Sequence, residues 1–346
     1  MPLLDVRDLS VSFDTADGVV QAVRGVSFSV DQGRTLGIVG ESGSGKSVAV
    51  QTVVGLTRGA RITGEAWFAD RDLLSSSPES LRAIRGRQVG MIFQDSLTSL
   101  HPYYRVGWQI VELIREHDRN VSRGTARRRA SELLTLVGVP DASRRMDDYP
   151  HEFSGGMRQR AMIAMAMAMN PALLIADEPT TALDVTVQAQ VLRVMGDLQR
   201  EFGTALIMIT HDLGVIADIA DDVVVMYAGA VMERTDRRSM FYRFHHPYTE
   251  GLLLSLPVPG DRRRLTSIPG QPPSLITLPA GCPFHPRCRY AFDQCREQTP
   301  PLRDVPDEAA HVSACWLPTR SEERDGVRNL VRARGQTARV AESSEP

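Results

Sequence analysis

Eight consecutive residues near the N-terminus have the types and the spacing of a phosphate-binding loop. The pattern G-x-x-x-x-G-K-[ST] is met in full by Gly40, Glu41, Ser42, Gly43, Ser44, Gly45, Lys46 and Ser47. In such a loop, glycines let backbone N–H groups turn toward phosphate oxygens, the lysine bridges the terminal phosphates, and the serine hydroxyl ligates Mg²⁺. The segment therefore predicts a site for nucleotide phosphates and Mg²⁺.

The single lysine of the chain lies in this loop. Lysine and arginine total 40, and subtracting Lys46 leaves 39 arginines. Genomic base composition accounts for such a bias over the whole chain. However, a compact ammonium group on a flexible stem fits a tight phosphate-binding loop, whereas a planar guanidinium does not. The position of the only lysine therefore supports the same site.

Two adjacent carboxylates follow a second apolar segment. ALLIADEP places Asp177 at the end of a strand predicted for residues 172–177, and Glu178 comes next. The carboxyl end of a buried strand lies near the nucleotide, so Asp177 is predicted to hold Mg²⁺, partly through water. Glu178 can then orient or deprotonate the attacking water. Alone, such a pair would more often cap the next helix, but a phosphate-binding loop elsewhere in the chain favours the catalytic interpretation.

Strands and helices alternate around these residues. Continuous apolar segments predict buried strands at 35–40, 89–93, 172–177, 204–210 and 222–229, with helical patterns between most of them. This alternation predicts an α/β fold with a mostly parallel sheet and helices on both faces. Short strands are predicted within residues 3–30, and a helical block at about 96–169 has the character of an insertion.

Composition limits the classes of function. The 346 residues suffice for about two domains, and a net charge of -2 gives no electrostatic case for binding nucleic acid. There is no run of 18 or more apolar residues, and MPLLDVRDLS lacks the order of a signal peptide. We therefore expect a cytosolic protein that reaches a membrane only by docking on other subunits.

Beyond about residue 257, prolines and turns dominate, and this segment holds every cysteine of the chain: Cys282, Cys288, Cys295 and Cys315. Five, six and nineteen residues separate them, which is not the usual spacing of a zinc ribbon. The spacing leaves two alternatives open. The four cysteines could form a structural metal site, which would hold either zinc or an iron–sulfur cluster, or they could be free thiols. His285 and His311 lie nearby but are not expected to be ligands.

Further motifs resemble those of ABC-type ATPases. The segment Phe153, Ser154, Gly155, Gly156 and Met157 resembles the signature LSGGQ. Gln94 resembles the glutamine of the Q-loop, and His211 resembles the switch histidine. The D-loop is similar to the segment Thr181, Ala182, Leu183 and Asp184. Order and spacing agree through residues 1–233. The resemblance implies a P-loop NTPase core with a mostly parallel sheet, an N-terminal antiparallel β subdomain, an inserted helical subdomain and a loop-rich C-terminal extension.

The family resemblance also implies residue roles in a head-to-tail dimer with two ATP molecules at its interface. Ser154, Gly155 and Gly156 would begin a helix whose N–H groups face the γ-phosphate bound by the other subunit. Met157 stands where the family has glutamine, and activity is expected to persist because the backbone donors remain. Asp184 would contact the other subunit.

The family resemblance also assigns roles to three side chains near the γ-phosphate or the adenine ring of ATP. Gln94 would sense Mg²⁺ and the attacking water, and His211 would contact the γ-phosphate and help to position the water. An aromatic residue at the place of Phe13 stacks on adenine in this family. Together with Glu178, Gln94 and His211 form the expected catalytic set.

Segments in the rest of the chain resemble the D-type ATPase of the oligopeptide, dipeptide and nickel importer family. They are DSLTSLHPYYRVGWQI, FYRFHHPYTEGLLLSLP, IPGQPPSL and GCPFHPRCRYAFDQC. The resemblance, which runs to about residue 318, implies a nucleotide-binding domain at 1–256 and an extension at 257–318. The charged remainder, 319–346, is predicted to be disordered.

This resemblance implies an ATPase that powers peptide import at the cytoplasmic face of the cell membrane. Its partners would be two membrane-spanning permease subunits, a second ABC ATPase subunit or a second copy of this chain, and an extracytoplasmic solute-binding protein. In this family the extension is associated with a [4Fe–4S] cluster, which the four cysteines would hold. The alternatives are import of nickel or another small solute, a soluble ABC ATPase of DNA repair or translation, and a small-molecule kinase.

Overall fold

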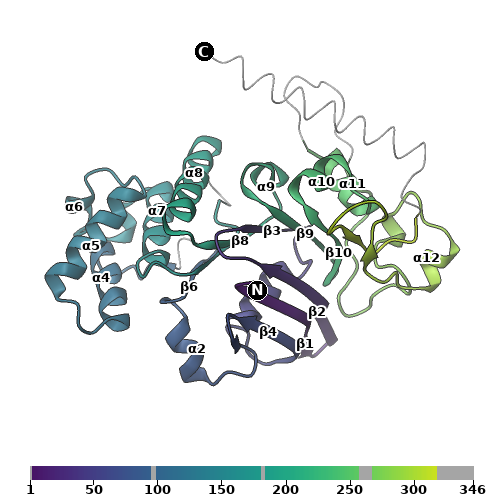
Figure 1. Cartoon of the computed structure of the whole chain (residues 1–346), viewed down its shortest axis with the longest axis horizontal. Helices are drawn as coiled ribbons and strands as arrows, with labels where there is room; N and C mark the ends of the chain where they lie inside the picture. The colour runs from purple at the N-terminus through teal and green to yellow at the C-terminus, as the bar shows by residue number, and fades with distance from the viewer. Residues whose placement is uncertain (1, 95–98, 181–183, 257–266, 318–346) are drawn as a thin grey trace, which may run out of the picture.

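The computed structural model describes residues 2–94, 99–180, 184–256 and 267–317, in which a smaller sheet packs against one face of a larger sheet (Figure 1). The smaller sheet has the strand order β2-β1-β4-β5, and the larger has the order β11-β12-β10-β9-β3-β8-β7-β6. The α/β class and the N-terminal antiparallel sheet agree with the prediction. The predicted disordered tail, 319–346, and the boundary at 257 lie outside the described residues.

The larger sheet is parallel where the sequence predicted buried strands. Its parallel strands are β3 (Thr35–Val39), β6 (Val89–Ile92), β7 (Leu173–Asp177), β8 (Ala205–Thr210) and β9 (Asp222–Tyr227). Antiparallel strands continue it: β10 (Ala230–Asp236), β12 (Val312–Ser313) and β11 (Arg303–Asp304). The C-terminal extension therefore adds two short strands to the edge of the main sheet, which the sequence pattern did not predict.

The smaller sheet consists of three long antiparallel strands and one short strand. Its members are β1 (Leu4–Thr15), β2 (Gly18–Val30), β4 (Ala60–Phe68) and β5 (Arg71–Asp72). The first two are longer than the short strands predicted from the sequence. The sequence reading missed β4 because most of its residues are exposed and carry no apolar alternation. It also missed α2 (Pro78–Ile84), a short helix capped by Ser77 with a single buried residue, Ile84.

Alternate residues of β7 show how the two faces of the main sheet are covered. Leu173 and Ile175 pack in the core shared with α1 (Lys46–Val53) and the smaller sheet. Leu174 and Ala176 pack in the other core, which includes residues of α7 (Gly155–Ala166), α8 (Val185–Phe202) and α9 (Leu213–Ile219). Helices do lie on both faces, but the smaller sheet covers much of the face that carries α1.

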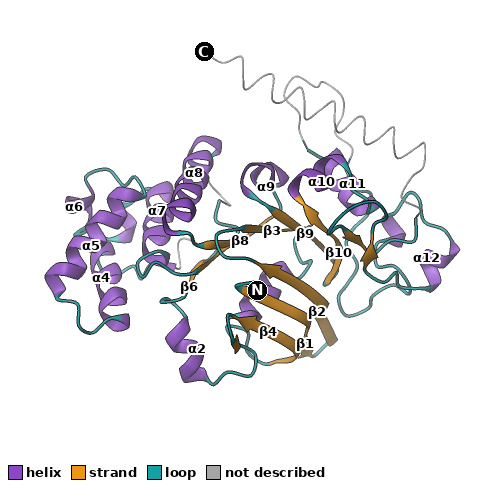
Figure 2. Cartoon of the chain, in the orientation of Figure 1, coloured by secondary structure: helices purple, strands orange, loops and turns teal. Residues whose placement is uncertain are grey.

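The helical block lies between β6 and β7 in the chain and forms one side of the molecule (Figure 2). It contains α4 (Val106–His117), α5 (Arg123–Leu136), α6 (Ala142–Arg145), the 3-10 turn η1 (Pro150–Glu152) and α7. Its boundaries at about 96 and 169 stay a prediction.

The last described part packs beside β10 at the opposite side (Figure 1). It follows α10 (Arg237–Tyr242) and α11 (Pro247–Leu254) and holds only the turn η2 (His285–Arg287), α12 (Asp293–Glu297) and the two edge strands. Among the described residues, no helix combines the length and apolar character that crossing a membrane would require.

Candidate functional site

The phosphate-binding loop joins the end of β3 to the start of α1. Two of its glycines are required by close packing. A Cβ on Gly40, whose φ is +153°, would lie 2.1 Å from the carbonyl oxygen of Met226, and a Cβ on Gly45, whose φ is +94°, would lie 2.2 Å from that of Ala22. Strands β9 and β2 therefore approach the loop so closely that only glycine fits at these two positions.

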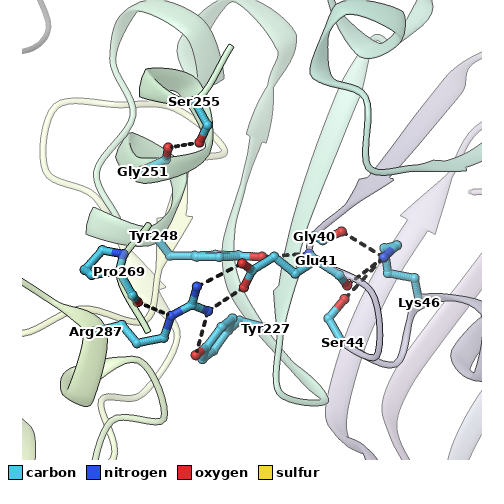
Figure 3. Close-up of polar contacts among 10 residues, drawn as sticks. All are labelled: Gly40, Glu41, Ser44, Lys46, Tyr227, Tyr248, Gly251, Ser255, Pro269 and Arg287. Carbon is cyan, nitrogen blue, oxygen red and sulfur yellow. Dashed lines mark hydrogen bonds and ion pairs between the residues drawn. The ribbon is translucent and has the colours of Figure 1, made fainter. Parts of the chain in front are cut away.

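Lys46 points back into the loop (Figure 3). Its side chain is buried, and Nζ donates hydrogen bonds to the carbonyl oxygens of Gly40 at 2.8 Å and Glu41 at 2.9 Å. Burial lowers the pKa of Lys46, whereas the nearby carboxylates of Glu178 and Asp177 oppose that shift. The ammonium group is thus held by loop carbonyls at the place where the sequence predicts phosphate oxygens.

Of the three residues predicted at the Mg²⁺ site, Ser47, Gln94 and Asp177, the first and the last are in direct contact. Ser47 Oγ donates to Asp177 Oδ1 at 2.7 Å, and Gln51 Nε2 donates to Asp177 Oδ2 at 3.2 Å. Burial raises the pKa of Asp177, while the bonds from Ser47 and Gln51 lower it. A hydroxyl beside a buried carboxylate is a donor set that suits Mg²⁺, and a divalent cation would favour the ionised carboxylate. Sequence reasoning missed Gln51, which lies one helical turn beyond Ser47.

Glu178, Gln94 and His211 come together at the end of β7, as their predicted roles require. Gln94 Nε2 donates to Glu178 Oε2 at 3.0 Å, and His211 Nδ1 lies 3.4 Å from Glu178 Oε1. Glu178 has a φ of 47°, and its N–H donates to the carbonyl of Ile209 at 2.9 Å. A left-handed conformation is uncommon for glutamate and is often found at functional sites. The carboxylate is therefore held between an amide and an imidazole.

The signature residues form the start of α7. Ser154 is the N-cap, and its Oγ accepts a hydrogen bond from the N–H of Met157 at 3.3 Å. A Cβ on Gly156 would lie 2.7 Å from Cγ1 of Val187, whereas a Cβ on Gly155 would meet nothing within 4 Å. Gly156 is therefore required by packing of α7 against α8, a reason that the sequence did not show. Within the described residues, no hydrogen bond or ion pair joins the signature to the phosphate-binding loop.

Asp184 and Phe13 have structural positions within the chain. Asp184 caps α8 by accepting the N–H of Val187 at 3.0 Å, while Thr181, Ala182 and Leu183 lie outside the described residues. Phe13 lies on β1 opposite Val20 and packs, partly buried, against the core. Subunit contact for Asp184 and adenine stacking for Phe13 stay predictions.

The four cysteines line one pocket together with residues that include Phe284 and Trp316. All four thiols are free; Cys288 is half-buried and the other three are buried. Burial raises the pKa of the Cys282 thiol, and it raises that of Cys288 to about 12. In the described part of the chain, no three His, Cys, Asp or Glu side chains are placed to hold a metal ion. The structure therefore gathers the thiols around one pocket but does not place them as ligands of a metal ion.

The fold and the phosphate site define an ATP-binding cassette of the ABC class. The family model for ABC transporters matches residues 23–181, and a model described as the oligopeptide/dipeptide transporter C-terminal region matches residues 232–295. A dimeric ATP-binding cassette solved in a post-hydrolysis state with ADP and Pi superimposes with a TM-score of 0.62 at 25% identity, covering 68% of this chain and 99% of that one.

Proteins of similar sequence show to which family within the ABC class the chain belongs. The chain is 51% identical over 320 residues to the oligopeptide transport ATP-binding protein OppD of Bacillus subtilis, covering 91% of this chain and 88% of the relative. It is 50% identical to OppD of Escherichia coli, covering 91% and 93%. It is also 48% identical to the dipeptide transport ATP-binding protein DppD of Lactococcus lactis, covering 91% and 90%. The chain belongs to this family of oligopeptide and dipeptide transport ATP-binding proteins.

Proposed function

We propose that this chain hydrolyses ATP to power the import of peptides, as an ATP-binding subunit of an ABC transporter. The observation that carries the proposal is the convergence of two residue groups at the ends of β3 and β7. Ser47 and Asp177 meet at 2.7 Å, and the adjacent Glu178 is held by Gln94. The peptide cargo follows from relatives named for oligopeptide and dipeptide transport.

Each side chain has a task in this reaction. Lys46 exchanges its loop carbonyls for oxygens of the terminal phosphates, and Ser47 with Asp177 would hold Mg²⁺, which would supply positive charge beside those phosphates. Glu178 accepts a proton from the attacking water as the water oxygen bonds to the γ-phosphorus, and the bond from that phosphorus to ADP breaks so that ADP leaves. Gln94 and His211 help to position the water, and His211 also contacts the γ-phosphate.

The active site is completed by a second ATPase subunit. In support of this arrangement, Ser154 and Gly155 begin α7 without a hydrogen bond to the phosphate-binding loop of their own chain, among the residues described. The free N–H groups at this helix start suit the γ-phosphate bound by another subunit. The second subunit is a related ATPase or another copy of this chain.

The remaining partners are two permease subunits and an extracytoplasmic solute-binding protein. Closure of the ATPase dimer on ATP draws the two helical blocks together, and each block grips a cytoplasmic loop of a permease. The chain is therefore peripheral to the cytoplasmic face of the membrane. Hydrolysis reopens the dimer and resets the permeases.

Affinity purification of the tagged chain from detergent-solubilised membranes tests this assembly. We expect two polytopic subunits to copurify, with or without a second ATPase, and mass spectrometry identifies them. A Lys46→Ala variant is the matched control, since it should retain the membrane partners but lose ATP-dependent turnover. Copurification of ribosomal or DNA-repair proteins with no membrane subunit would contradict the transport role.

We also propose that the four cysteines bind an iron–sulfur cluster. The proposal is supported by the pocket that the four cysteines share. It is also supported by the scarcity of regular structure in the extension, because a bound metal cluster would stabilise the fold of such a segment. A cluster holds its ligand sulfurs farther apart than a single ion does, so closely spaced donors are not required. Burial raises the pKa of Cys282 and Cys288, and binding to the cluster as thiolates would lower the pKa of both thiols again.

Anaerobically purified protein is expected to contain about four iron and four acid-labile sulfide per chain. Cys288→Ser should lower both, while Ser255→Ala, a change outside the cysteine segment, should lower neither. Absence of iron and sulfide from the parent would rule out the cluster. Zinc bound in their place would favour a structural zinc site.

A further inference from the structure

A buried arginine of the C-terminal extension contacts the phosphate-binding loop (Figure 3). The Arg287 side chain is 5% exposed and forms a two-point ion pair with Glu41: Nη1 lies 2.6 Å from Oε2, and Nη2 lies 3.0 Å from Oε1. Its Nε donates to the carbonyl of Pro269 at 2.8 Å, and Nη1 lies 3.3 Å from the hydroxyl of Tyr227. The guanidinium group is therefore fixed by partners on several sides.

Glu41 is itself held at three points. Its N–H donates to the hydroxyl of Tyr248 at 2.8 Å, its carboxylate pairs with Arg287, and its carbonyl accepts from Lys46 at 2.9 Å. Tyr248 lies on α11 and is fully buried against Phe284, with the ring centroids 5.3 Å apart. Two of the three anchors of this loop residue thus come from beyond residue 246.

Arg287 belongs to the cysteine segment. It ends the short turn η2, which lies between Cys282 and Cys288. The carbonyl of Cys282 accepts the N–H of His285, and the N–H of Cys288 donates to the carbonyl of His285. A contact between Arg287 and Glu41 therefore connects the cysteine segment to the loop that precedes Lys46.

This contact has two physical consequences for a nucleotide. A loop that is already ordered does not have to be ordered by the ligand, so less of the binding free energy is lost. In addition, a carboxylate beside a polyanionic ligand repels it, and a paired arginine offsets that charge. The Glu41 side chain is 27% exposed with Arg287 in place, and without Arg287 it would be an unpaired carboxylate within the phosphate-binding loop.

We propose that Arg287 is a positioning residue for ATP: by holding and neutralising Glu41, it sets the affinity of the phosphate-binding loop. It acts through Glu41 and does not contact the nucleotide itself. The proposal rests on the nucleotide site of the proposed function, and it assigns the C-terminal extension a part in that site. Removal of Arg287 should therefore raise the KM for ATP and leave kcat at saturating ATP nearly unchanged.

Two measurements on the full-length chain test the proposal. Isothermal titration calorimetry at low temperature, where hydrolysis is slow, measures the binding of MgATP, and steady-state assays measure its hydrolysis. Arg287→Gln is expected to weaken binding about tenfold, equivalent to about 1.4 kcal/mol. Glu41→Gln combined with Arg287→Gln should recover most of that loss, because both charges are then absent. Arg289→Gln is the matched control, since Arg289 is a neighbouring arginine whose ion pair is with Glu250 on α11.

Arg287→Lys keeps the charge but loses the two-point geometry, and it should weaken binding less than Arg287→Gln does. It also provides a test if the glutamine variant does not fold. Equal ATP affinity in the parent, Arg287→Gln and Arg287→Lys would overturn the proposal, and so would a double variant as weak as Arg287→Gln alone. Failure of the parent to bind ATP would instead overturn the nucleotide site on which the proposal rests.

Discussion

Glu178→Gln is expected to reduce ATP hydrolysis by the full-length chain about a thousandfold while MgATP binding persists. The amide has nearly the shape of the carboxylate but cannot accept a proton from water. The contacts with Gln94 at 3.0 Å and His211 at 3.4 Å lie on the two carboxylate oxygens, so a change of charge alters the chemistry more than the packing. Binding persists because Lys46, Ser47 and Asp177 are unchanged.

In the proposed mechanism hydrolysis reopens the ATPase dimer, so the variant should also accumulate as an ATP-bound dimer. Single-turnover measurements with radiolabelled ATP and gel filtration in MgATP record both effects. Glu201→Gln is a matched control, the same substitution at an exposed position of α8, and should hydrolyse ATP as the parent does. If Glu178→Gln retained hydrolysis within about threefold of the parent, water activation would have to be assigned to another group.

The residues of the proposed nucleotide site could be found in the sequence because several of them form local patterns. Residues 40–47 form a contiguous motif, and Asp177 ends a strand that is otherwise apolar, with Glu178 directly after it. Gln94 and His211 are single residues far apart in sequence, and only the register of the whole motif set identified them. The structure brings both to Glu178, and their roles at the phosphate stay predictions.

What could not be predicted depends on contacts between distant segments. Glu41 and Arg287 are 246 positions apart, and nothing local distinguishes Arg287 from the other 38 arginines. The need for glycine at 156 likewise arises from Val187 on another helix. Strand β10 was missed because VMERTD mixes charged and apolar residues, although Glu233 in its middle is completely buried.

That buried glutamate connects the main sheet to the extension through an ion pair with His311. Glu233 and His311 are both 0% exposed, and Nε2 of His311 lies 2.7 Å from Oε1 of Glu233. The N–H of His246 donates to Oε2 at 3.0 Å, and the N–H of His245 donates to Oε1. A carboxylate in this position is costly to bury unless it is fully hydrogen-bonded, as it is here.

Glu233→Gln is expected to lower the free energy of unfolding by about 3–5 kcal/mol at pH 7. The amide leaves His311 without a carboxylate, and its NH₂ group has to face a backbone N–H of His245 or His246. Urea unfolding followed by fluorescence measures the change. Glu65→Gln is the control: Glu65 lies 3.8 Å from Arg7 at the surface, where the loss should not exceed about 1 kcal/mol.

The pH dependence of unfolding separates the charge of Glu233 from its packing. Burial raises the pKa of Glu233, but His311, Thr249 and the N–H of His245 together outweigh burial and lower it from 4.5 to about 2. Because the pKa is lower in the folded state, the stabilisation is complete above about pH 4.5 and is lost as the pH falls toward about 2. The parent should therefore lose stability over this interval more steeply than Glu233→Gln. Parallel curves for the two proteins would mean that Glu233 stabilises the extension by packing and neutral hydrogen bonds, without a net contribution from its charge.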